Sequence, residues 1–283
     1  MHTTVIERRR FLGLTGGLAA TAVLPRIARA DAVTLKSIKE SGKLRIGVEA
    51  AYVPFTFRKD GQIVGYDIDL ADIFTKSLGV KPDVIDTAWA GVIPSLYAKK
   101  FDIIMSAMTY TAERVQRVAF SIPYAEASQA LLIRAGDTGT IKGLDDLSGK
   151  VVGIKLGSPG EVLVKRHDEG IKQRKGGKGI TEVKVFNDHP AAYLSLGQGK
   201  VDAVYNTIPT LAMVLRDQPG KFAMVKGIGH EAWAGIAVRK EDPEIVEFLN
   251  TEIRRLKADE TLYKLQEKWF GFRMSLANEV QKF

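Results

Sequence analysis

The chain has 283 residues, with 41 Lys and Arg against 33 Asp and Glu, a formal net charge of +8 and no Cys. Without cysteine, disulfides and lipid attachment through an N-terminal cysteine are both excluded. Residues 1–30 hold five Arg and one Glu and so carry +4 of the net charge. A further basic cluster, residues 172–179, has no aromatic residues on which bases can stack, which favours a solvated, mobile loop. The charge therefore predicts no nucleic-acid partner.

Residues 1–30 are predicted to be a signal peptide. A basic stretch, residues 7–13, precedes the apolar residues 14–24, and Ala28-Arg29-Ala30 then supplies a small-x-small cleavage site. The consecutive arginines are typical of the twin-arginine type, and an ordinary secretory signal is the alternative. The apolar segment of about 11 residues is shorter than the ~20 that a bilayer span needs. We therefore expect a soluble, exported protein of the periplasm that is not lipid-anchored.

The first predicted elements after this leader are a strand at residues 44–48 and a helix that starts near Tyr66. The apolar residues of the helix recur at offsets of 0, 4, 7, 8 and 12, and they are Tyr66, Leu70, Ile73, Phe74 and Leu78. Asp67 is predicted to cap the helix, while Asp69 and Asp72 suit the positive end of its dipole. Gly79 suits the helix end. These carboxylates have a structural interpretation and are not candidates for catalysis or metal binding.

Short β-branched runs alternate with helical patterns along the rest of the chain, which indicates an α/β fold. An internal echo supports two similar lobes, because residues 96–105 match residues 196–205 in character. Each segment is a helix end that runs through Lys, an apolar residue and Asp into a buried strand. Open parallel sheets bind ligands beyond the carboxyl ends of their strands. The segments that follow, residues 106–114 and 206–209, are therefore predicted to lie at the ligand site.

Four motifs occur in the same order as in a known protein family. They are Tyr52-Val53-Pro54-Phe55, Gly65-Tyr66-Asp67-Ile68-Asp69-Leu70-Ala71, Ser106-Ala107-Met108-Thr109 with Arg114, and Lys268-Trp269-Phe270-Gly271. In these motifs the chain resembles the periplasmic solute-binding proteins of family 3, the glutamine-, lysine-arginine-ornithine- and histidine-binding type. The resemblance implies a two-lobed periplasmic-binding-protein fold of type II, with a mixed sheet and flanking helices in each lobe and two hinge strands. Lobe 1 would comprise residues 31–127 and 228–283, and lobe 2 residues 128–227.

The resemblance also implies a function. Such a protein is the substrate-binding subunit of an ABC uptake transporter, and it captures an amino acid or a related small carboxylate by closing its two lobes. Its expected partners are this small molecule and an ABC permease in the inner membrane, and a chemoreceptor is left open as a further partner. We expect a monomer without a cofactor. No metal site is predicted, because His167, His189 and His230 lie far apart without ligands at metal-binding spacing.

The expected carboxylate site lies on lobe 1. Arg114 offers a planar fork of donors that fits a carboxylate bidentately, and in the family the matching arginine holds the α-carboxylate of the ligand. The Thr109 hydroxyl and the backbone amides around Ala107 and Thr109 are expected to complete a cradle that includes Ser106. A surface ion pair between Arg114 and Glu113 is the alternative.

Three further residues of lobe 1 are expected to contact the ligand. Tyr52 and Trp89 stand where the family places aromatic rings that sandwich the ligand, and such rings exclude water and attract organic cations. Glu49 matches an acidic position that, in relatives, contacts the side chain or the cationic end of the ligand. A solvated carboxylate is the alternative for Glu49.

Lobe 2 departs from the family pattern in its first ligand loop, residues 155–160. The Ser158 hydroxyl and the Gly160 amide can still serve a carboxylate, but Pro159 has no amide hydrogen to donate. Lys155 matches a basic residue that some glutamine-binding relatives use. The loop is therefore expected to bind through Lys155, Ser158 and Gly160.

The second departure of lobe 2 is Thr207, which stands where most amino-acid binders carry an Asp that pairs with the α-ammonium. An ammonium that loses its water without a partner costs on the order of several kcal/mol. Asn206 can offer a neutral amide contact instead. We therefore expect a small organic carboxylate whose nitrogen, if present, is recognised differently from a standard α-amine. An ordinary polar amino acid stays open if water or Glu161 replaces the missing Asp.

An enzyme is the alternative function, because the same fold hosts proteins that resemble cyclohexadienyl and arogenate dehydratases. Glu161 or Glu49 would then act as the general acid, with a pKa raised by burial, and Lys155 or Arg114 would bind the substrate carboxylates. Function follows the site and not the fold. The binding protein is the preferred interpretation.

Overall fold

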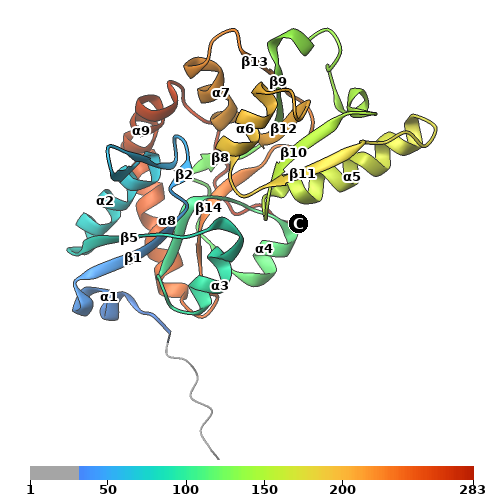
Figure 1. Cartoon of the computed structure of the whole chain (residues 1–283). Coiled ribbons are helices and arrows are strands. Elements are labelled where there is room, and N and C mark those ends of the chain that lie inside the picture. The colour runs from blue at the N-terminus through green and yellow to red at the C-terminus, as the bar shows by residue number, and fades with distance from the viewer. Residues whose placement is uncertain (1–31) are drawn as a thin grey trace, which may run out of the picture. The chain divides into compact units, whose positions relative to one another are not determined.

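Two mixed β-sheets, each flanked by helices, form the architecture of the protein (Figure 1). The computed structural model describes residues 32–283, so the predicted signal peptide lies outside the described residues. The arrangement confirms the predicted α/β fold class. Within residues 32–283, no helix combines the length and the apolar character that crossing a membrane requires.

The first sheet has the strand order β5-β1-β6-β14-β7, and β8 also pairs with β14. Its strands are β1 (Lys43–Val48), β5 (Lys81–Asp86), β6 (Ile103–Thr109), β7 (Ala119–Phe120), β8 (Ala125–Glu126) and β14 (Trp233–Val238). Strand β1 is parallel to β5 and β6, whereas β14 runs antiparallel to β6. The associated helices are α1 (Leu35–Ser41), α2 (Tyr66–Leu78), α3 (Val92–Tyr97), α4 (Ala112–Arg117), α8 (Pro243–Ala258) and α9 (Thr261–Phe270). The predicted strand at residues 44–48 is confirmed as part of β1.

The second sheet has the order β11-β10-β12-β9-β13. Its strands are β9 (Gln129–Arg134), β10 (Val151–Lys155), β11 (Glu182–Phe186), β12 (Ala203–Thr207) and β13 (Phe222–Val225), and its helices are α5 (Pro159–Arg174), α6 (His189–Gly197) and α7 (Ile208–Asp217). Short elements complete the fold: β2 (Ala51–Tyr52), β3 (Thr56–Lys59), β4 (Gln62–Val64), η1 (Trp89–Gly91), η2 (Ala135–Asp137) and η3 (Leu144–Leu147). The chain passes between the sheets after β8 and after β13. The lobe limits at residues 127 and 228 stay a prediction.

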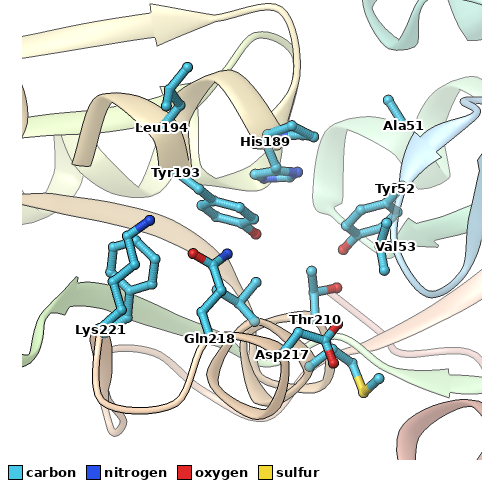
Figure 2. A pocket seen from close by; sticks show the side chains of 14 residues that line it. Ala51, Tyr52, Val53, His189, Tyr193, Leu194, Thr210, Asp217, Gln218 and Lys221 are labelled. Atoms are coloured by element: carbon cyan, nitrogen blue, oxygen red, sulfur yellow. The ribbon is translucent and has the colours of Figure 1, made fainter. Parts of the chain in front are cut away.

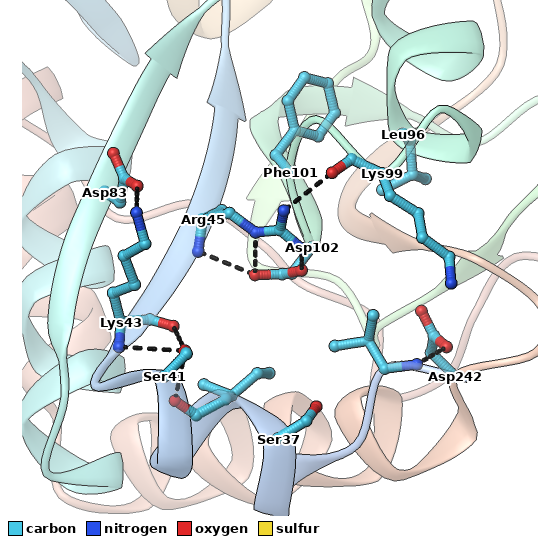
Figure 3. Close-up of polar contacts among 12 residues, drawn as sticks. Ser37, Ser41, Lys43, Arg45, Asp83, Leu96, Lys99, Phe101, Asp102 and Asp242 are labelled. Carbon is cyan, nitrogen blue, oxygen red and sulfur yellow. Dashed lines mark hydrogen bonds and ion pairs between the residues drawn. The ribbon is translucent and has the colours of Figure 1, made fainter. Parts of the chain in front are cut away.

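The internal echo of the sequence has a structural counterpart. Strand β6 pairs with β1, and β12 pairs with β10, each in parallel and at echo-related positions. Asp102 Oδ2 accepts a hydrogen bond from the Arg45 amide at 3.0 Å, and Asp202 Oδ2 accepts one from the Val151 amide at 2.9 Å. Figure 3 shows the Asp102 carboxylate between the amide and the guanidinium of Arg45. Each echo Asp therefore ties the start of the neighbouring parallel strand to the strand that follows the Asp.

The predicted cap at the start of α2 is wrong. Gly65 is the N-cap and makes no side-chain capping bond, whereas Asp67 is fully buried. The carboxylate of Asp67 accepts hydrogen bonds from the hydroxyls of Thr56 at 3.0 Å and Tyr124 at 2.9 Å. The first amides of α2 donate instead to the carbonyls of residues 54 and 55. Because the loop before β3 already satisfies these donors, the helix start needs no side-chain acceptor.

The predicted apolar face and end of α2 are confirmed, and Asp69 lies in its first turn as expected, but Asp72 lies beyond the first turn, too far from the helix start to meet the positive end of the dipole. Four of the five apolar residues are buried and Ile73 is partly buried against the same core. Gly79 is the C-cap in the left-handed conformation, with φ of 73°. The basic cluster at residues 172–179 differs from the predicted loop, because its first residues form the last turn of α5. There Lys172 pairs with Asp168, and Arg174 pairs with Asp145.

Replacing Gly65 by Ala is expected to destabilise the protein by about 2–3 kcal/mol. Gly65 has φ of 142°, and an added Cβ would lie 2.2 Å from the Phe55 carbonyl oxygen, so either the loop or the helix start must move. Gly91→Ala is the control, because that Cβ would meet no atom within 4 Å and φ is −101°. The measurement is urea unfolding of both variants. Equal stabilities would contradict the close approach at Gly65.

Candidate functional site

A small cavity of about 20 Å³ lies between the ends of the two sheets. Its lining consists of Tyr52, Trp89, Ser106, Ala107, Thr109, Arg114, Gln129, Lys155, Ser158, Pro159, His189, Asn206 and Thr207. Ten of the twelve predicted site residues are among them, and the two exceptions are Glu49 and Gly160. The cavity lies where β6 and β12 end, which is the place that the topology of parallel sheets predicts. We call it the central cavity.

Arg114 is held in place by two backbone carbonyls. Its Nη1 donates to the Thr109 oxygen at 2.9 Å, and its Nη2 donates to the Gly157 oxygen at 2.8 Å. The guanidinium also lies 5.2 Å from the centroid of the Trp89 ring. Burial lowers the pKa of Arg114 to about 10, partly opposed by Glu113, so the side chain stays charged at neutral pH. The first bond is local, whereas the second links the β6 side of the cavity to the loop after β10.

Lys155 lines the central cavity and forms an ion pair with Glu49, which lies outside the lining. Both side chains are almost fully buried, with relative exposures of 4% and 8%. The Lys155 ammonium lies 5.1 Å from the Tyr52 ring and 4.8 Å from the Trp89 ring. Burial lowers the pKa of Lys155, while the adjacent Glu49 opposes this shift. The two rings that were expected to flank a ligand thus flank the ammonium of Lys155.

Thr207 and Asn206 meet a tyrosine of the opposite side. The Tyr52 hydroxyl lies 3.0 Å from the Thr207 hydroxyl and donates to the Asn206 side-chain oxygen at 3.3 Å. The Asn206 amide donates to the Tyr193 hydroxyl, and the Thr207 hydroxyl donates to that of Thr210 at 3.1 Å. Every one of these polar groups therefore has a hydrogen-bond partner within the protein.

Three further predicted residues, Ser106, Ala107 and Gly160, contact other parts of the protein in this structure. The Ser106 hydroxyl accepts from the Glu49 amide at 3.1 Å, and the Ala107 amide donates to the Tyr124 hydroxyl at 2.8 Å. Gly160 packs closely, because an added Cβ would lie 3.1 Å from the Cβ of Tyr205. The Ala107 amide thus faces the hydroxyl of Tyr124, which in turn donates to the buried Asp67.

Three residues that line the cavity were missed by the sequence reasoning: Gln129, Pro159 as a wall, and His189. The sequence offers His189 only as a candidate metal ligand, and it is rejected in that role because the other histidines lie far away in the chain. Its ring stacks at 5.5 Å on Tyr52 and at 5.9 Å on Tyr193. The useful signal was its position directly after Asp188, the N-cap of α6, which places it at the end of the helix nearest the site.

Glu161, the acid that the enzyme alternative needs, does not line the central cavity. Its carboxylate accepts a hydrogen bond from the Gly157 amide at 2.9 Å. Glu49, the other candidate acid, is paired with Lys155. Neither carboxyl group is therefore placed as a free general acid in the cavity. Within residues 32–283, no group of three His, Asp or Glu is arranged to hold a metal ion.

Two α/β units with a polar, aromatic-lined cavity between their strand ends define a two-lobed solute-binding protein. Residues 44–272 match the bacterial extracellular solute-binding proteins, family 3, and the chain belongs to this family. The resemblance noted from the motifs is thereby confirmed.

Individual relatives agree with the family. The chain is 32% identical to the L-cystine-binding protein TcyJ of Escherichia coli (strain K12), over 96% of this chain and 98% of that protein. It is 30% identical to the histidine-binding periplasmic protein of the same strain, again over 96% and 98%. Among solved structures, the ancestral amino acid-binding protein AncCDT-1, a precursor of cyclohexadienyl dehydratase, matches with a TM-score of 0.75 and 35% identity, over 83% of this chain and 99% of that one. These relatives are named as binding proteins and not as enzymes.

Proposed function

We propose that this protein is the substrate-binding subunit of an ABC uptake transporter, and that it captures an amino acid or a related small carboxylate in the periplasm. The named relatives bind cystine and histidine, and the histidine-binding one is periplasmic. Residues 1–30 would direct export, by the twin-arginine or the general route. An ABC permease of the inner membrane would receive the solute from the closed form, which the ligand stabilises.

One observation carries the proposal of a carboxylate ligand. Arg114 and Lys155 bring two buried positive charges to the lining of the central cavity, and Glu49, which lies outside the lining, pairs with Lys155 alone. A buried charge without a counter-ion is costly, so the cavity favours a ligand that supplies one negative charge. The guanidinium of Arg114 suits a carboxylate, because its fork of donors can bind both oxygens at once. In this proposal the carboxylate replaces the Gly157 carbonyl at Nη2.

The nitrogen of the ligand meets no dedicated carboxylate at Thr207. Thr207 and Asn206 offer neutral oxygen acceptors, and the aromatic positions beside them are already taken by the Lys155 ammonium. An α-ammonium would therefore rest on neutral hydrogen bonds or on Glu49. We infer that the deaminated analogue of the best ligand keeps more of the affinity than in a binder with an Asp at this position.

Replacing Arg114 by Ala is expected to weaken binding of the best ligand by at least a hundredfold, because charge-assisted hydrogen bonds to a buried carboxylate are lost. Arg114→Lys keeps the charge without the fork, and its affinity for the ligand is expected to lie between those of the native protein and Arg114→Ala. Isothermal titration calorimetry against L-amino acids, betaine-like zwitterions, plain carboxylates and amines identifies the ligand and measures the loss.

Arg117→Ala is the matched control, since Arg117 lies on the same helix and pairs with Glu113 at the surface. This variant is expected to bind like the native protein. Unchanged affinity in Arg114→Ala would show that the carboxylate is held elsewhere. Tight binding of L-amino acids, with weak binding of their deaminated analogues, would contradict the inference drawn from Thr207.

A further inference from the structure

A second, larger cavity of about 310 Å³ shares two lining residues with the central cavity, and Figure 2 shows its lining. It is lined by residues 51–53, by one face of α6, by one face of α7, and by residues 221 and 222. Tyr52 and His189 line both cavities. We call the larger cavity the outer pocket. It lies between the β2 segment on one side and helices of the second sheet on the other.

A row of stacked groups leads from Arg114 to the outer pocket. Its successive members are Arg114, Trp89, Lys155, Tyr52, His189 and Tyr193. The distances between neighbours along the row, measured to ring centroids, are 5.2, 4.8, 5.1, 5.5 and 5.9 Å. The outer pocket borders this row from Tyr52 onwards, because Tyr52, His189 and Tyr193 all line it. A solute that is held by its carboxylate at Arg114 therefore needs to extend only past Tyr52 to enter the outer pocket.

His189 marks the junction of the two cavities. The residue is only 5% exposed, and its Nδ1 is buried without a hydrogen-bond partner among the described residues. Burial and the nearby Lys155 hold the pKa of His189 well below its ordinary value, so the imidazole is neutral at neutral pH. In Figure 2 the ring lies between those of Tyr52 and Tyr193. A buried polar atom without a partner calls for an explanation, and a passing solute can satisfy it.

The lining of the outer pocket favours an uncharged occupant. Apolar side chains form much of its wall, namely Val53, Leu194, Met213, Val214 and Phe222. The charged side chains of the lining, Asp217 and Lys221, are exposed. No buried carboxylate faces the pocket from the described residues, so a cationic end group would lose its water without a counter-ion.

We propose that the outer pocket is a subsite of the ligand cleft and takes the extended, uncharged arm of a solute whose carboxylate is held at Arg114. The solute class is an amino acid with a long, uncharged thioether or aromatic arm. This inference rests on the proposed function, because it uses the same carboxylate site. The central cavity alone has room for about one water molecule, so an arm of several atoms needs adjoining space.

Two other cavities border the central one, and they differ in character. One of about 300 Å³ is lined by Glu113, Arg117 and Lys165 and lies beside Arg114 itself. The other, of about 350 Å³, borders Thr109 and Gln129. Val162 lines both of these cavities and is 57% exposed, which makes it a probe for them. Neither cavity is lined by His189 or Tyr52.

The test compares two substitutions that fill different cavities from the surface. Leu194 lines the outer pocket and is 62% exposed, so Leu194→Trp can fill the pocket without disturbing the core. Calorimetry measures the affinity for S-benzyl-L-cysteine, which has a long uncharged arm, for L-arginine, which has a long cationic arm, and for the shortest L-amino acid that binds. We expect the native protein to prefer S-benzyl-L-cysteine over both. Leu194→Trp is expected to weaken binding of S-benzyl-L-cysteine at least tenfold and to leave the affinity for the short amino acid within about twofold.

Val162→Trp is the matched control and is expected to change neither affinity. His189→Phe keeps the ring stack but removes the ring nitrogens, and is expected to weaken binding of S-benzyl-L-cysteine several-fold more than that of the short amino acid. The subsite is overturned if Leu194→Trp leaves the affinity for S-benzyl-L-cysteine unchanged, if it weakens both ligands equally, or if Val162→Trp is the variant that weakens S-benzyl-L-cysteine. A native protein that binds short amino acids as tightly as S-benzyl-L-cysteine overturns the subsite alone. One that binds no carboxylate overturns the proposed function as well.

Discussion

Replacing Glu49 by Gln is expected to open the unliganded protein. The Lys155 ammonium would then lie buried between Tyr52 and Trp89 with no negative partner. Removing one member of a buried ion pair costs about 3–5 kcal/mol, because the remaining charge stays desolvated. Parting of the two halves rehydrates the ammonium and avoids this cost. Small-angle X-ray scattering should therefore give a larger radius of gyration for Glu49→Gln than for the native protein.

Two further variants make this result specific. Glu49→Gln combined with Lys155→Met removes the uncompensated charge and is expected to restore the compact form. Asp83→Asn breaks the exposed pair of Lys43 with Asp83, and is expected to change nothing, since exposed pairs contribute about 0–1 kcal/mol. If Glu49→Gln alters neither the radius of gyration nor the stability, then the pair does not hold the two halves together.

Replacing Asp67 by Asn is expected to remove a large part of the pH dependence of stability. Asp67 is fully buried, and burial raises its pKa to about 7, opposed by hydrogen bonds from Tyr124, Thr56 and the Ala107 amide. Between about pH 4 and pH 7 the folded protein keeps this proton, whereas the unfolded chain has lost it. The free energy of unfolding that this group contributes therefore falls as the pH rises through this range and is constant above it. The total change is about 4 kcal/mol.

The measurement is urea unfolding of the native protein and of Asp67→Asn at several pH values between about 4 and 8. Asn does not titrate, so the variant is expected to lack this slope. Thr56→Val is the matched control, because it removes one hydroxyl that favours the carboxylate and so should extend the slope to higher pH. Parallel profiles for the native protein and Asp67→Asn would show that Asp67 is ionised in the folded state throughout.

Part of the candidate site was predictable, because its residues follow the carboxyl ends of parallel strands. Parallel strands bring their carboxyl ends to one edge of a sheet, so the residues after β6 and β12 were expected to converge. Arg114 and Thr207 follow this rule, and both line the central cavity. The echo Asp residues were also predictable as a pair, since Asp102 and Asp202 precede matching strands and make matching bonds.

Other features could not be read from local pattern. Asp67 has the sequence context of a helix cap, but the carbonyls of residues 54 and 55 satisfy the amides of α2, and Tyr124 and Thr56 bind the carboxylate. His189 has no motif at all. Its meaning arises only from the rings of Tyr52 and Tyr193 that lie on either side of it. The contacts of Asp67 with Tyr124 and of His189 with Tyr52 join residues that are far apart in the chain.

By itself, the sequence determined the α/β fold, because helical and strand periodicity are local properties, and its motifs indicated the family and most of the residues that face the cavity. Only the tertiary structure decided what those residues contact. Lys155 meets Glu49 and Arg114 meets the Gly157 carbonyl because the two sheets approach each other closely at their strand ends. The outer pocket depends on the same approach, since one wall comes from β2 and the other from α6 and α7. The packing of the two halves, which no local pattern encodes, sets these contacts.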